Sequence, residues 1–279
     1  MSGNTSKIIA YNYFGGKFTY LEEIYAEFPK KVPHLIDLFG GSFSVSLNFK
    51  GNGIITANEL NTDITNFFMV LRDHLDALMQ KLYFTPCSER EYHNCWEPST
   101  CKIEQARRFY VRVRQSFFGL GAQRNNKGFH MAKSQVNCRR GETVSRWNNA
   151  LTKLYYVANV IRNNFQITNL DYAKCIDKLD FPEALFYVDP PYSKRSRASF
   201  NDYKFEFTDE NHEQLASKLN YIKGKAMVSG YDCSLMNNLY KDWRKVKLKS
   251  RKNNIRTKKV QEVIWMNYDK ENPTNSMFK

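Results

Sequence analysis

A carboxylate and two prolines close one of the most apolar stretches of the chain. The stretch LFYVDPPYSK covers residues 185–194, and its apolar part is typical of a buried strand that ends at Asp189. Neither Pro190 nor Pro191 can donate a backbone hydrogen bond, so a sheet cannot continue through them. An acid fixed at a strand end in this way indicates a binding or catalytic site; the alternative is a proline-rich turn that only ends the strand.

A glycine-rich turn and a second acid indicate what such a site would bind. DLFGGSFSVSLN (37–48) follows a predicted strand, and its glycines allow a sharp turn and close approach of the backbone to a ligand. Roughly twenty residues later, TANELN ends the next strand with Glu59, an acid placed to accept hydrogen bonds from ribose hydroxyls. Together they indicate a nucleoside-type cofactor, with a purely structural turn as the alternative. The sequence lacks GxxxxGK[ST] and GxGxxG, which argues against a P-loop and an ordinary NAD site.

Another glycine pair precedes these motifs. In YNYFGGKFTY (11–20), Lys17 directly follows Gly15 and Gly16. Its ammonium group could meet a carboxylate or phosphate at a helix N-terminus. The alternative is a plain loop before a helix.

These residues need a sheet to bring them together. Helical patterns separate several of the apolar runs, and the clearest helix begins after Thr208 as N-cap, with Asp209 and Glu210 in its first turn. Strands alternating with helices predict an α/β fold with an open, largely parallel, Rossmann-like sheet of about seven strands. The predicted strands are 35–38, 54–57, 166–169, 184–188, 225–229, 245–249 and 262–267.

The middle of the chain differs from its two ends. From 67 to 158 the sequence shows helical patterns and many arginines but few strand-like runs. The simplest architecture is one α/β domain built from 1–66 and 159–279, with a basic helical insertion at 67–158.

Composition narrows the class of protein. A chain of 279 residues with 42% hydrophobic residues can build a full core. Its formal net charge of +14 favours a polyanionic partner, of which nucleic acid is the commonest, over an indifferent basic surface. Six cysteines without a CxxC pair predict free thiols in a reducing compartment and no metal site. No apolar run of signal-peptide or membrane-span length occurs, so we expect a soluble, cytoplasmic protein.

Taken in order, YFGGK, DLFGG, NEL, NLDY and DPPY resemble the motifs of the Dam-type, or D12-class, DNA adenine-N6 methyltransferases. The segments 116–130, 196–216 and 262–268 resemble further parts of that family, so the resemblance spans nearly the whole chain. It implies a methyltransferase sheet that binds S-adenosylmethionine (AdoMet), a target-recognition insertion at 67–158, and DNA as partner in a bacterial or phage-infected cell.

The resemblance also implies a role for each matching residue. Lys17 would meet the carboxylate of AdoMet, Glu59 its ribose hydroxyls and Tyr172 its adenine. The expected cofactor-binding residues are Tyr13, Gly16, Lys17, Asp37, Phe39, Gly41, Glu59, Asp171, Tyr172 and Asp189. One residue departs from the family pattern: Phe43 stands where a glycine is usual, and we expect its side chain to narrow the methionine end of the pocket.

The expected catalytic residues are Asp189, Pro190, Pro191 and Tyr192. The Asp189 carboxylate and the Pro190 carbonyl would each accept one hydrogen of an adenine amino group and so localise the nitrogen lone pair for in-line attack on a methyl group. Tyr192 would stack on a base flipped out of the duplex. Methyltransferases that act on glutamine carry NPPY at this place, with an asparagine. The aspartate of DPPY fits adenine as the substrate better.

Basic segments beside the predicted site supply the expected DNA contacts. RKVKLKSRKNNIRTKK (244–259) predicts two strands joined by a basic turn, and the loop 193–204 follows DPPY directly. For the 244–259 run a solvated charged face is the alternative. The expected DNA-binding residues are Arg124, Asn126, Lys127, Lys194, Arg195, Arg197 and Lys252.

Several alternatives stay open at the level of sequence. The same chemistry could act on RNA, on single-stranded DNA or on cytosine N4, and a catalytically silent DNA-binding homologue would share the fold. The residues do not reveal the recognition sequence, nor whether the enzyme is solitary, restriction-associated or from a phage. Monomeric action would suit an asymmetric methyl transfer.

Overall fold

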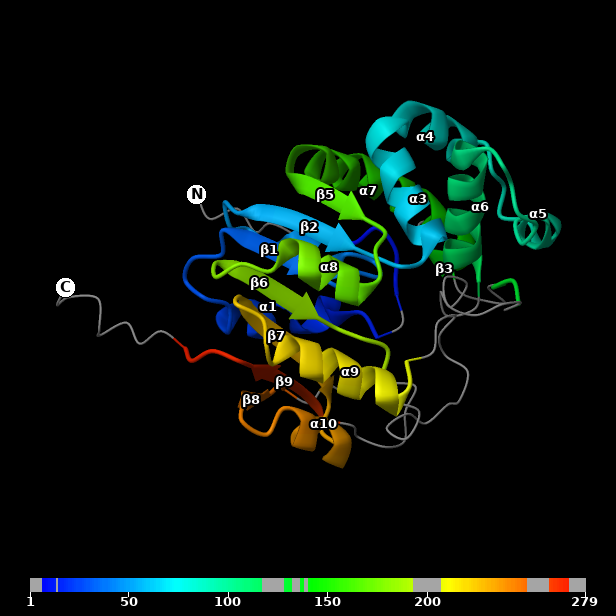
Figure 1. The fold of residues 1–279 in the computed structure, drawn as a ribbon. Helices are drawn as coiled ribbons and strands as arrows, with labels where there is room; N and C mark the ends of the chain where they lie inside the picture. The colour runs from blue at the N-terminus through cyan, green and yellow to red at the C-terminus, as the bar shows by residue number, and fades with distance from the viewer. Residues whose placement is uncertain are drawn as a thin grey trace, which may run out of the picture.

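A seven-stranded mixed sheet forms the centre of the molecule (Figure 1). The computed structural model describes residues 7–13, 15–116, 128–131, 136–137, 140–192, 207–249 and 261–270. Within these ranges the strand order is β5-β2-β1-β6-β7-β9-β8, and the first five strands are parallel. They are β5 (Phe165–Thr168), β2 (Ile54–Asn58), β1 (His34–Asp37), β6 (Ala184–Val188) and β7 (Lys225–Tyr231).

The last two strands complete one edge of the sheet. β9 (Glu262–Met266) runs antiparallel to β7, and β8 (Arg244–Lys247) pairs antiparallel with β9. All seven predicted strands are therefore confirmed, with ends that differ by two residues or fewer. A separate pair of two-residue strands, β3 (Val136–Asn137) and β4 (Arg140–Gly141), is antiparallel.

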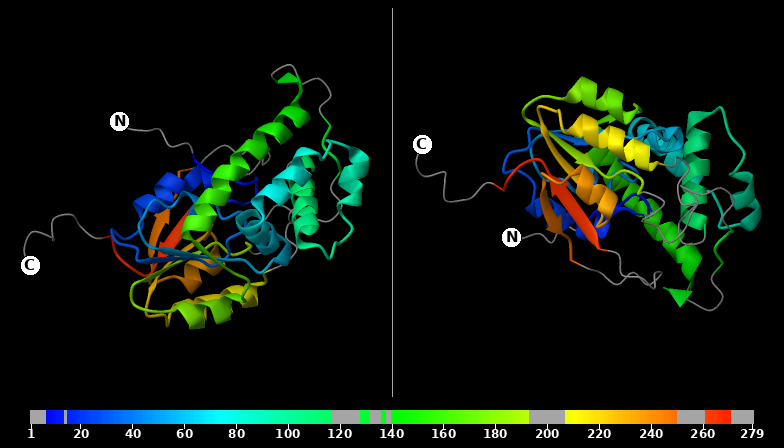
Figure 2. Two further views of the ribbon diagram at one scale, coloured as in Figure 1. Left: turned by 90° about the horizontal axis from the view of Figure 1, so that it is seen from above. Right: turned by 60° about the horizontal axis from the view of Figure 1, so that its bottom comes forward.

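Helices cover both faces of the sheet, which explains why its central strands are apolar on both sides. Buried residues of α8 (Tyr172–Leu179), α9 (Asp209–Leu219) and α10 (Ser234–Leu239) pack on the face that includes Ile36. The opposite face, which includes Leu35, is covered by α1 (Leu21–Ala26) and α2 (Ser44–Asn48); a short 3-10 helix η1 (Lys17–Tyr20) precedes α1. Figure 2 shows β7, β8 and β9 between these two layers.

The helices between β2 and β5 form a layered cluster at the other edge. They are α3 (Thr62–Asp73), α4 (Leu75–Tyr83), α5 (Glu89–Asn94), α6 (Lys102–Gln115) and α7 (Glu142–Asn164). α3 packs against both α6 and α7, and α4 does the same. One hydrophobic cluster joins α3, α4, α6 and α7 to Ile55, Ala57 and Phe165 of the sheet, so this segment shares a core with the strands beside it.

The strand order reverses between β1 and β6. From β1 the chain continues outward to β2 and β5, whereas β6 is followed by β7 on the other side. In open parallel sheets, ligands bind in the crevice beyond the carboxyl ends of the strands at such a reversal. Here the segments DLFGG and DPPY leave β1 and β6 at that point. Within the described ranges, no helix combines the length and apolar character that a membrane crossing requires.

Replacing Thr208 by alanine is expected to destabilise the fold. Thr208 is the N-cap of α9 as predicted, and it forms a capping box with Asn211. Loss of the cap should lower the free energy of unfolding by about 1 kcal/mol, and the melting temperature by about 2–4 °C. Thermal unfolding of T208A beside S217A, which changes an exposed serine on the same helix, measures the effect; equal melting temperatures would contradict the role of the cap.

Candidate active site

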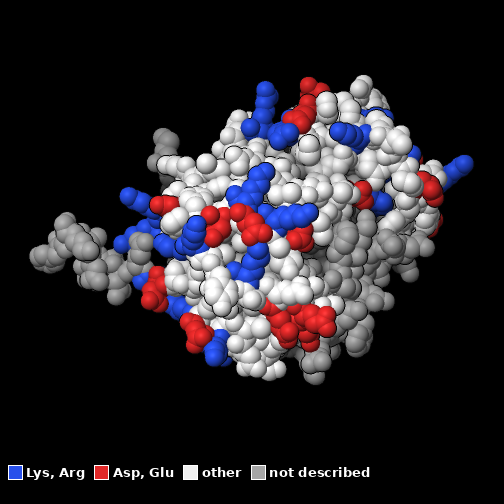
Figure 3. Space-filling model, viewed as in Figure 1, with Lys and Arg blue, Asp and Glu red and all other residues white. Residues whose placement is uncertain are grey.

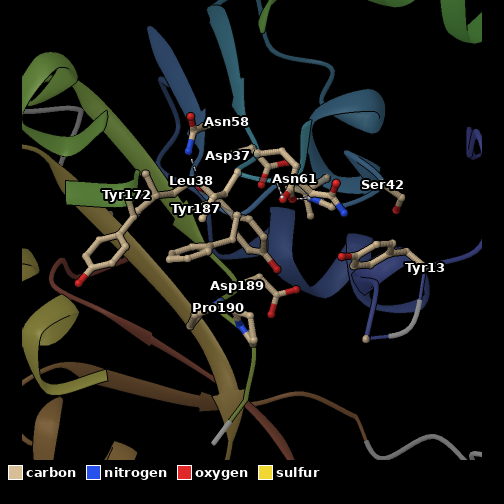
Figure 4. A pocket seen from close by; sticks show the side chains of 18 of the residues that line it. Tyr13, Asp37, Leu38, Ser42, Asn58, Asn61, Tyr172, Tyr187, Asp189 and Pro190 are labelled. Atoms are coloured by element: carbon tan, nitrogen blue, oxygen red, sulfur yellow. Dashed lines mark hydrogen bonds between the residues drawn. The ribbon is translucent and has the colours of Figure 1, made fainter. Parts of the chain in front are cut away.

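A cavity of about 480 Å³ opens at the reversal between β1 and β6. That volume lies in the range of cofactor pockets, about 300–1,000 Å³. Its walls come from the turn with Gly15 and Gly16 that precedes η1, the turn after β1, the end of β2, the start of α8 and the segment after β6. Figure 4 shows Tyr13, Asp37 and Asp189 around one space, with Tyr172 on its far side.

The structure brings together every cofactor-binding residue that the sequence predicted. All ten line the cavity: Tyr13, Gly16, Lys17, Asp37, Phe39, Gly41, Glu59, Asp171, Tyr172 and Asp189. Pro190 and Pro191 line it as well, whereas Tyr192 does not. Motifs separated by more than a hundred residues therefore converge on one site.

The carboxylate of Glu59 is held by backbone amides. One oxygen accepts a hydrogen bond from Gly41 N at 2.8 Å and the other from Asn61 N at 2.8 Å. Burial raises the pKa of Glu59, and these amide hydrogen bonds oppose the rise. Gly41 has φ +53, and a Cβ there would press against the ring of Tyr13, so a glycine is needed for both conformation and space.

Asn58 ties three chain segments together beneath this acid. Its amide donates to the carbonyls of Leu38 and Leu170, at 3.1 and 2.9 Å. Its oxygen accepts from Thr168 Oγ1 at 2.8 Å and from Leu170 N at 2.9 Å. All of the hydrogen-bonding capacity of this buried side chain thus fixes the ends of β1, β2 and β5 relative to one another.

Asp37 is a buried acid on the cavity wall with only 2% of its surface exposed. Burial raises its pKa to about 7; a 2.7 Å hydrogen bond from Ser46 Oγ opposes this, and the nearby charge of Asp189 adds to it. The group therefore changes its protonation state near neutral pH.

Asp189 lies directly after β6 and forms an ion pair with Lys17. Lys17 Nζ donates to both carboxylate oxygens, at 2.8 and 2.9 Å, and also to the carbonyl of Gly15 at 2.8 Å. The lysine is only 2% exposed, so the pair is largely shielded from water. The ammonium group predicted to meet a ligand carboxylate thus contacts the carboxylate of Asp189 in this structure.

The expectation for Phe43 was wrong. Its side chain is absent from the cavity wall and fully buried, where its ring packs 4.4 Å from that of Phe68 and 6.3 Å from that of Phe165. The reason is its left-handed backbone, φ 54, which turns the side chain into the core instead of the pocket. Such a conformation costs an L-residue about 1–2 kcal/mol, and burial of the ring, worth about 1.5–3 kcal/mol, offsets it.

Aromatic rings form one wall of the cavity. Phe39 and Tyr172 are stacked with ring centroids 5.8 Å apart, and Phe207 meets both rings edge-on. Asp171 caps α8 by accepting a hydrogen bond from Ala173 N at 2.9 Å. A planar, aromatic ligand group would fit against such a wall.

Tyr192 lies beside the cavity and not in its wall. Its hydroxyl donates to Glu262 Oε2 at 2.8 Å and approaches Asp189 Oδ1 at 3.3 Å. Its ring lies 4.3 Å from that of Tyr231, and Lys17 Nζ lies 4.9 Å from its centroid. Burial raises the pKa of Tyr192 well above its ordinary value, so the hydroxyl remains a donor.

Sequence reasoning missed several residues of the site, Asn58 and Asn61 among them. Phe207 and Asn211 line the cavity, and Ser229 and Glu262 hydrogen-bond to Asp189 and Tyr192, respectively. Two of them left a signal in the sequence: Ser229 is a hydroxyl inside an apolar strand, and Glu262 is an acid that opens the last strand.

The predicted DNA contacts all fall outside the described residues; these are Arg124, Asn126, Lys127, Lys194, Arg195, Arg197 and Lys252. The undescribed segments hold 14 of the 42 Lys and Arg but 3 of the 28 Asp and Glu, so they account for 11 of the 14 excess positive charges. Accordingly, the face in Figure 3 shows Lys and Arg interspersed with Asp and Glu. Among the described residues, no cluster of His, Cys, Asp and Glu has a composition suited to hold a metal ion.

The buried acid predicts a pH-dependent stability. Because the folded pKa of Asp37, about 7, exceeds the ordinary 3.8, the native state binds the extra proton between these values, and stability falls as pH rises through that window. The asparagine of D37N cannot ionise in this window. The melting temperature of D37N minus that of wild type should therefore be several degrees larger at pH 8 than at pH 5.

Thermal unfolding at the two pH values measures this difference. D73N is the control, since Asp73 is paired with Arg72 and its pKa is lowered instead of raised. A difference between D37N and wild type that is the same at both pH values would contradict the assignment.

Comparison with known proteins agrees with this geometry. The family described as D12 class N6 adenine-specific DNA methyltransferase matches residues 13–257. The chain is 25% identical over 236 residues to the Type II methyltransferase M.FokI of Planomicrobium okeanokoites, covering 77% of this chain and 34% of that protein. It is 23% identical over 290 residues to the Modification methylase StsI of Streptococcus sanguinis, covering 92% and 42%.

The chain thus spans between a third and a half of the length of these curated relatives. A solved structure described as a conserved hypothetical protein of Streptococcus pyogenes is 10% identical, with a TM-score of 0.33 over 91% of this chain and 96% of that one. This score is too low for the likeness to bear on fold or function. The family match extends over most of the chain and includes all of the motifs at the cavity, so the chain belongs to the family of D12 class N6 adenine-specific DNA methyltransferases.

Proposed function

We propose that this chain transfers a methyl group from AdoMet to N6 of an adenine in DNA. The observation that carries the proposal is the placement of Asp189 and its two prolines on the wall of a cavity at the reversal of the sheet. Family membership supports the same reaction. The names of the relatives, a type II methyltransferase and a modification methylase, support a role in restriction-modification.

The residues of the cavity suit AdoMet. The carboxylate of Glu59, held by the amides of Gly41 and Asn61, can still accept hydrogen bonds from two ribose hydroxyls. The wall of Phe39, Tyr172 and Phe207 provides a surface for the adenine ring, and Asp171 lies beside it. When bound, the cofactor supplies a methyl group made electrophilic by its sulfonium.

Lys17 would change partners when the site is filled. Its ammonium group now neutralises Asp189, and the α-carboxylate of the cofactor is a second anion that it can bind. We infer that Lys17 turns toward this carboxylate and thereby frees the oxygens of Asp189. The catalytic acid becomes available as an acceptor only once the cofactor is in place.

Asp189 and Pro190 would then activate the adenine amino group. The Asp189 carboxylate accepts one hydrogen and the Pro190 carbonyl accepts the other, which localises the lone pair on N6. The methyl group would then pass to N6: a carbon–nitrogen bond would form, the carbon–sulfur bond would break, and its electron pair would stay on sulfur. The methylated nitrogen then loses one proton, which the Asp189 carboxylate would accept.

The remaining parts of the chain would hold the DNA. We propose that 1–66 and 159–279 form the catalytic part and that 67–158 form the target-recognition part. α3 runs across the first of these limits and α7 across the second. Adenine would be flipped out of duplex DNA, with Tyr192, held by Glu262, as the surface on which it stacks.

We propose that Arg124, Asn126, Lys127, Lys194, Arg195, Arg197 and Lys252 contact the nucleic acid, because these basic and amide side chains suit phosphates and base edges. Such an enzyme would act in the cytoplasm of a bacterial or phage-infected cell. We further propose that it acts as a monomer, since one adenine receives one methyl group at a time.

Replacing Asp189 by alanine is expected to abolish methyl transfer. The variant loses the acceptor for the amino hydrogen, and activity should fall by about a thousandfold or more. The protein is incubated with labelled AdoMet and duplex DNA of mixed sequence, and the methylated nucleoside is identified after digestion. N6-methyladenine from wild type alone supports the proposal.

Three results would contradict parts of it. If the product is N4-methylcytosine, the target base is cytosine and not adenine. If only single-stranded DNA or RNA is methylated, the substrate is not duplex DNA. No transfer to any nucleic acid by a folded protein would contradict the enzymatic function itself.

Removing the aromatic wall is expected to weaken cofactor binding. Phe207→Ala deletes a ring that contacts both Phe39 and Tyr172. A stacked aromatic contact with a base is worth about 1–3 kcal/mol, so the Kd for AdoMet should rise by about tenfold in isothermal titration calorimetry. Tyr221→Ala removes an exposed ring outside the cavity and serves as the control; equal Kd values for the two variants would refute the role of Phe207.

A further inference from the structure

The carboxylate of Asp189 is bound unequally at its two oxygens. Oδ1 accepts from Ser229 Oγ at 2.7 Å, from Lys17 Nζ at 2.8 Å and, more weakly, from the Tyr192 hydroxyl at 3.3 Å. Oδ2 accepts from Lys17 Nζ alone among the described residues, at 2.9 Å. If the lysine turned away, Oδ1 would keep donors whereas Oδ2 would have none of these.

Strand pairing places Ser229 beside the catalytic acid. β6 and β7 are parallel with Val188 opposite Val228, so the next residues along the two strands, Asp189 and Ser229, are neighbours. Alternation along a strand puts Leu185, Tyr187 and Asp189 on one face, and Met227 and Ser229 share it. The hydroxyl is therefore directed to the carboxylate by the sheet itself and not by a flexible loop.

Ser229 is buried and contacts Asp189 from outside the cavity. Ser229 is 0% exposed and is absent from the wall of the cavity. A hydroxyl buried without a partner would be costly, and the donor of Ser229 is satisfied by Asp189.

Tyr187 determines the direction of the hydrogen bond. Its hydroxyl donates to Ser229 Oγ at 3.4 Å. Burial raises the pKa of Tyr187 well above its ordinary value, so that hydroxyl keeps its proton. Ser229 thus accepts from Tyr187 and donates to Asp189, and the short chain of hydrogen bonds ends on Oδ1.

We propose that Ser229 is a positioning residue that holds Oδ1 of Asp189 and leaves Oδ2 to accept the hydrogen of the adenine amino group. The inference rests on the proposed function and adds to it a definite orientation of the catalytic carboxylate. Lys17 is the exchangeable partner of the acid, and Ser229 is the permanent one. The hydrogen bond from Ser229 on β7 therefore determines, before the substrate binds, which oxygen of Asp189 is available to it.

The first test separates rate from binding. In S229A, the kcat for methyl transfer to duplex DNA should fall by about tenfold to a hundredfold, because a misdirected acceptor slows the reaction without removing a binding contact. The KM for DNA and the calorimetric Kd for AdoMet should stay within about twofold of wild type. S229C should lie between wild type and S229A, because its thiol has similar size but is a weak donor.

T56V is the matched control. Thr56 is another buried hydroxyl of the same sheet, but its partners are His34 and Gln166 and it lies outside the cavity wall. T56V should lower the melting temperature and leave kcat unchanged. An unchanged kcat in S229A, or a fall of kcat matched by equal losses in AdoMet binding and melting temperature, would overturn the positioning role. Absence of methyl transfer by wild type would instead contradict the proposed function.

An amide at position 189 tests the choice of oxygen. In D189N, donation from Ser229 would hold the amide oxygen at the Oδ1 position and point the NH2 group at the substrate, which should abolish activity. Without the Ser229 donor the side-chain amide can flip and direct its oxygen to the substrate. S229A/D189N should therefore be more active than D189N. A double variant that is no more active than D189N would overturn the assignment of Oδ2 to the substrate.

Discussion

Three carboxylates, Asp37, Glu59 and Asp189, line one cavity, and the site depends on how burial of these acids is compensated. Each acid is accommodated differently. Burial lifts the pKa of Asp37 to about 7, so this group carries little charge below neutrality. Backbone amides hold Glu59, and a lysine and a serine hydroxyl hold Asp189. Of the three acids, Asp189 is the one whose charge is balanced by a lysine.

The topology of the sheet creates this concentration of charge. β1, β2 and β6 are parallel and adjacent, so their carboxyl ends meet at one edge, and each delivers its acid there. The amide of Asn58 fixes the same ends through four hydrogen bonds. A cavity lined by three carboxylates therefore follows from strand order together with one acid at the end of each strand.

Much of this was predictable from local patterns. Apolar runs, breakers and caps act over a few residues, which is why the seven strands and the start of α9 at Thr208 could be predicted and why the acids were expected at strand ends. Phe207 could not be found in this way, because its relation to the site depends on where a distant helix begins. The hydroxyl of Ser229 is visible inside an apolar strand, but its relation to the site depends on which strands pair. The direction of the Phe43 side chain depends on a backbone dihedral angle that the residue type alone does not reveal.

Phe43 and Gly40 constrain each other. The buried ring of Phe43 occupies the space into which any Cβ at Gly40 would project, and the amide of Gly40 also donates to the carbonyl of Asn58 at 2.8 Å. In evolutionary terms the two positions are epistatic: an alanine at 40 is accessible only to a lineage that has first exchanged the phenylalanine for a smaller residue. Among related sequences, a phenylalanine at the position of Phe43 should therefore be accompanied by a glycine three residues before it.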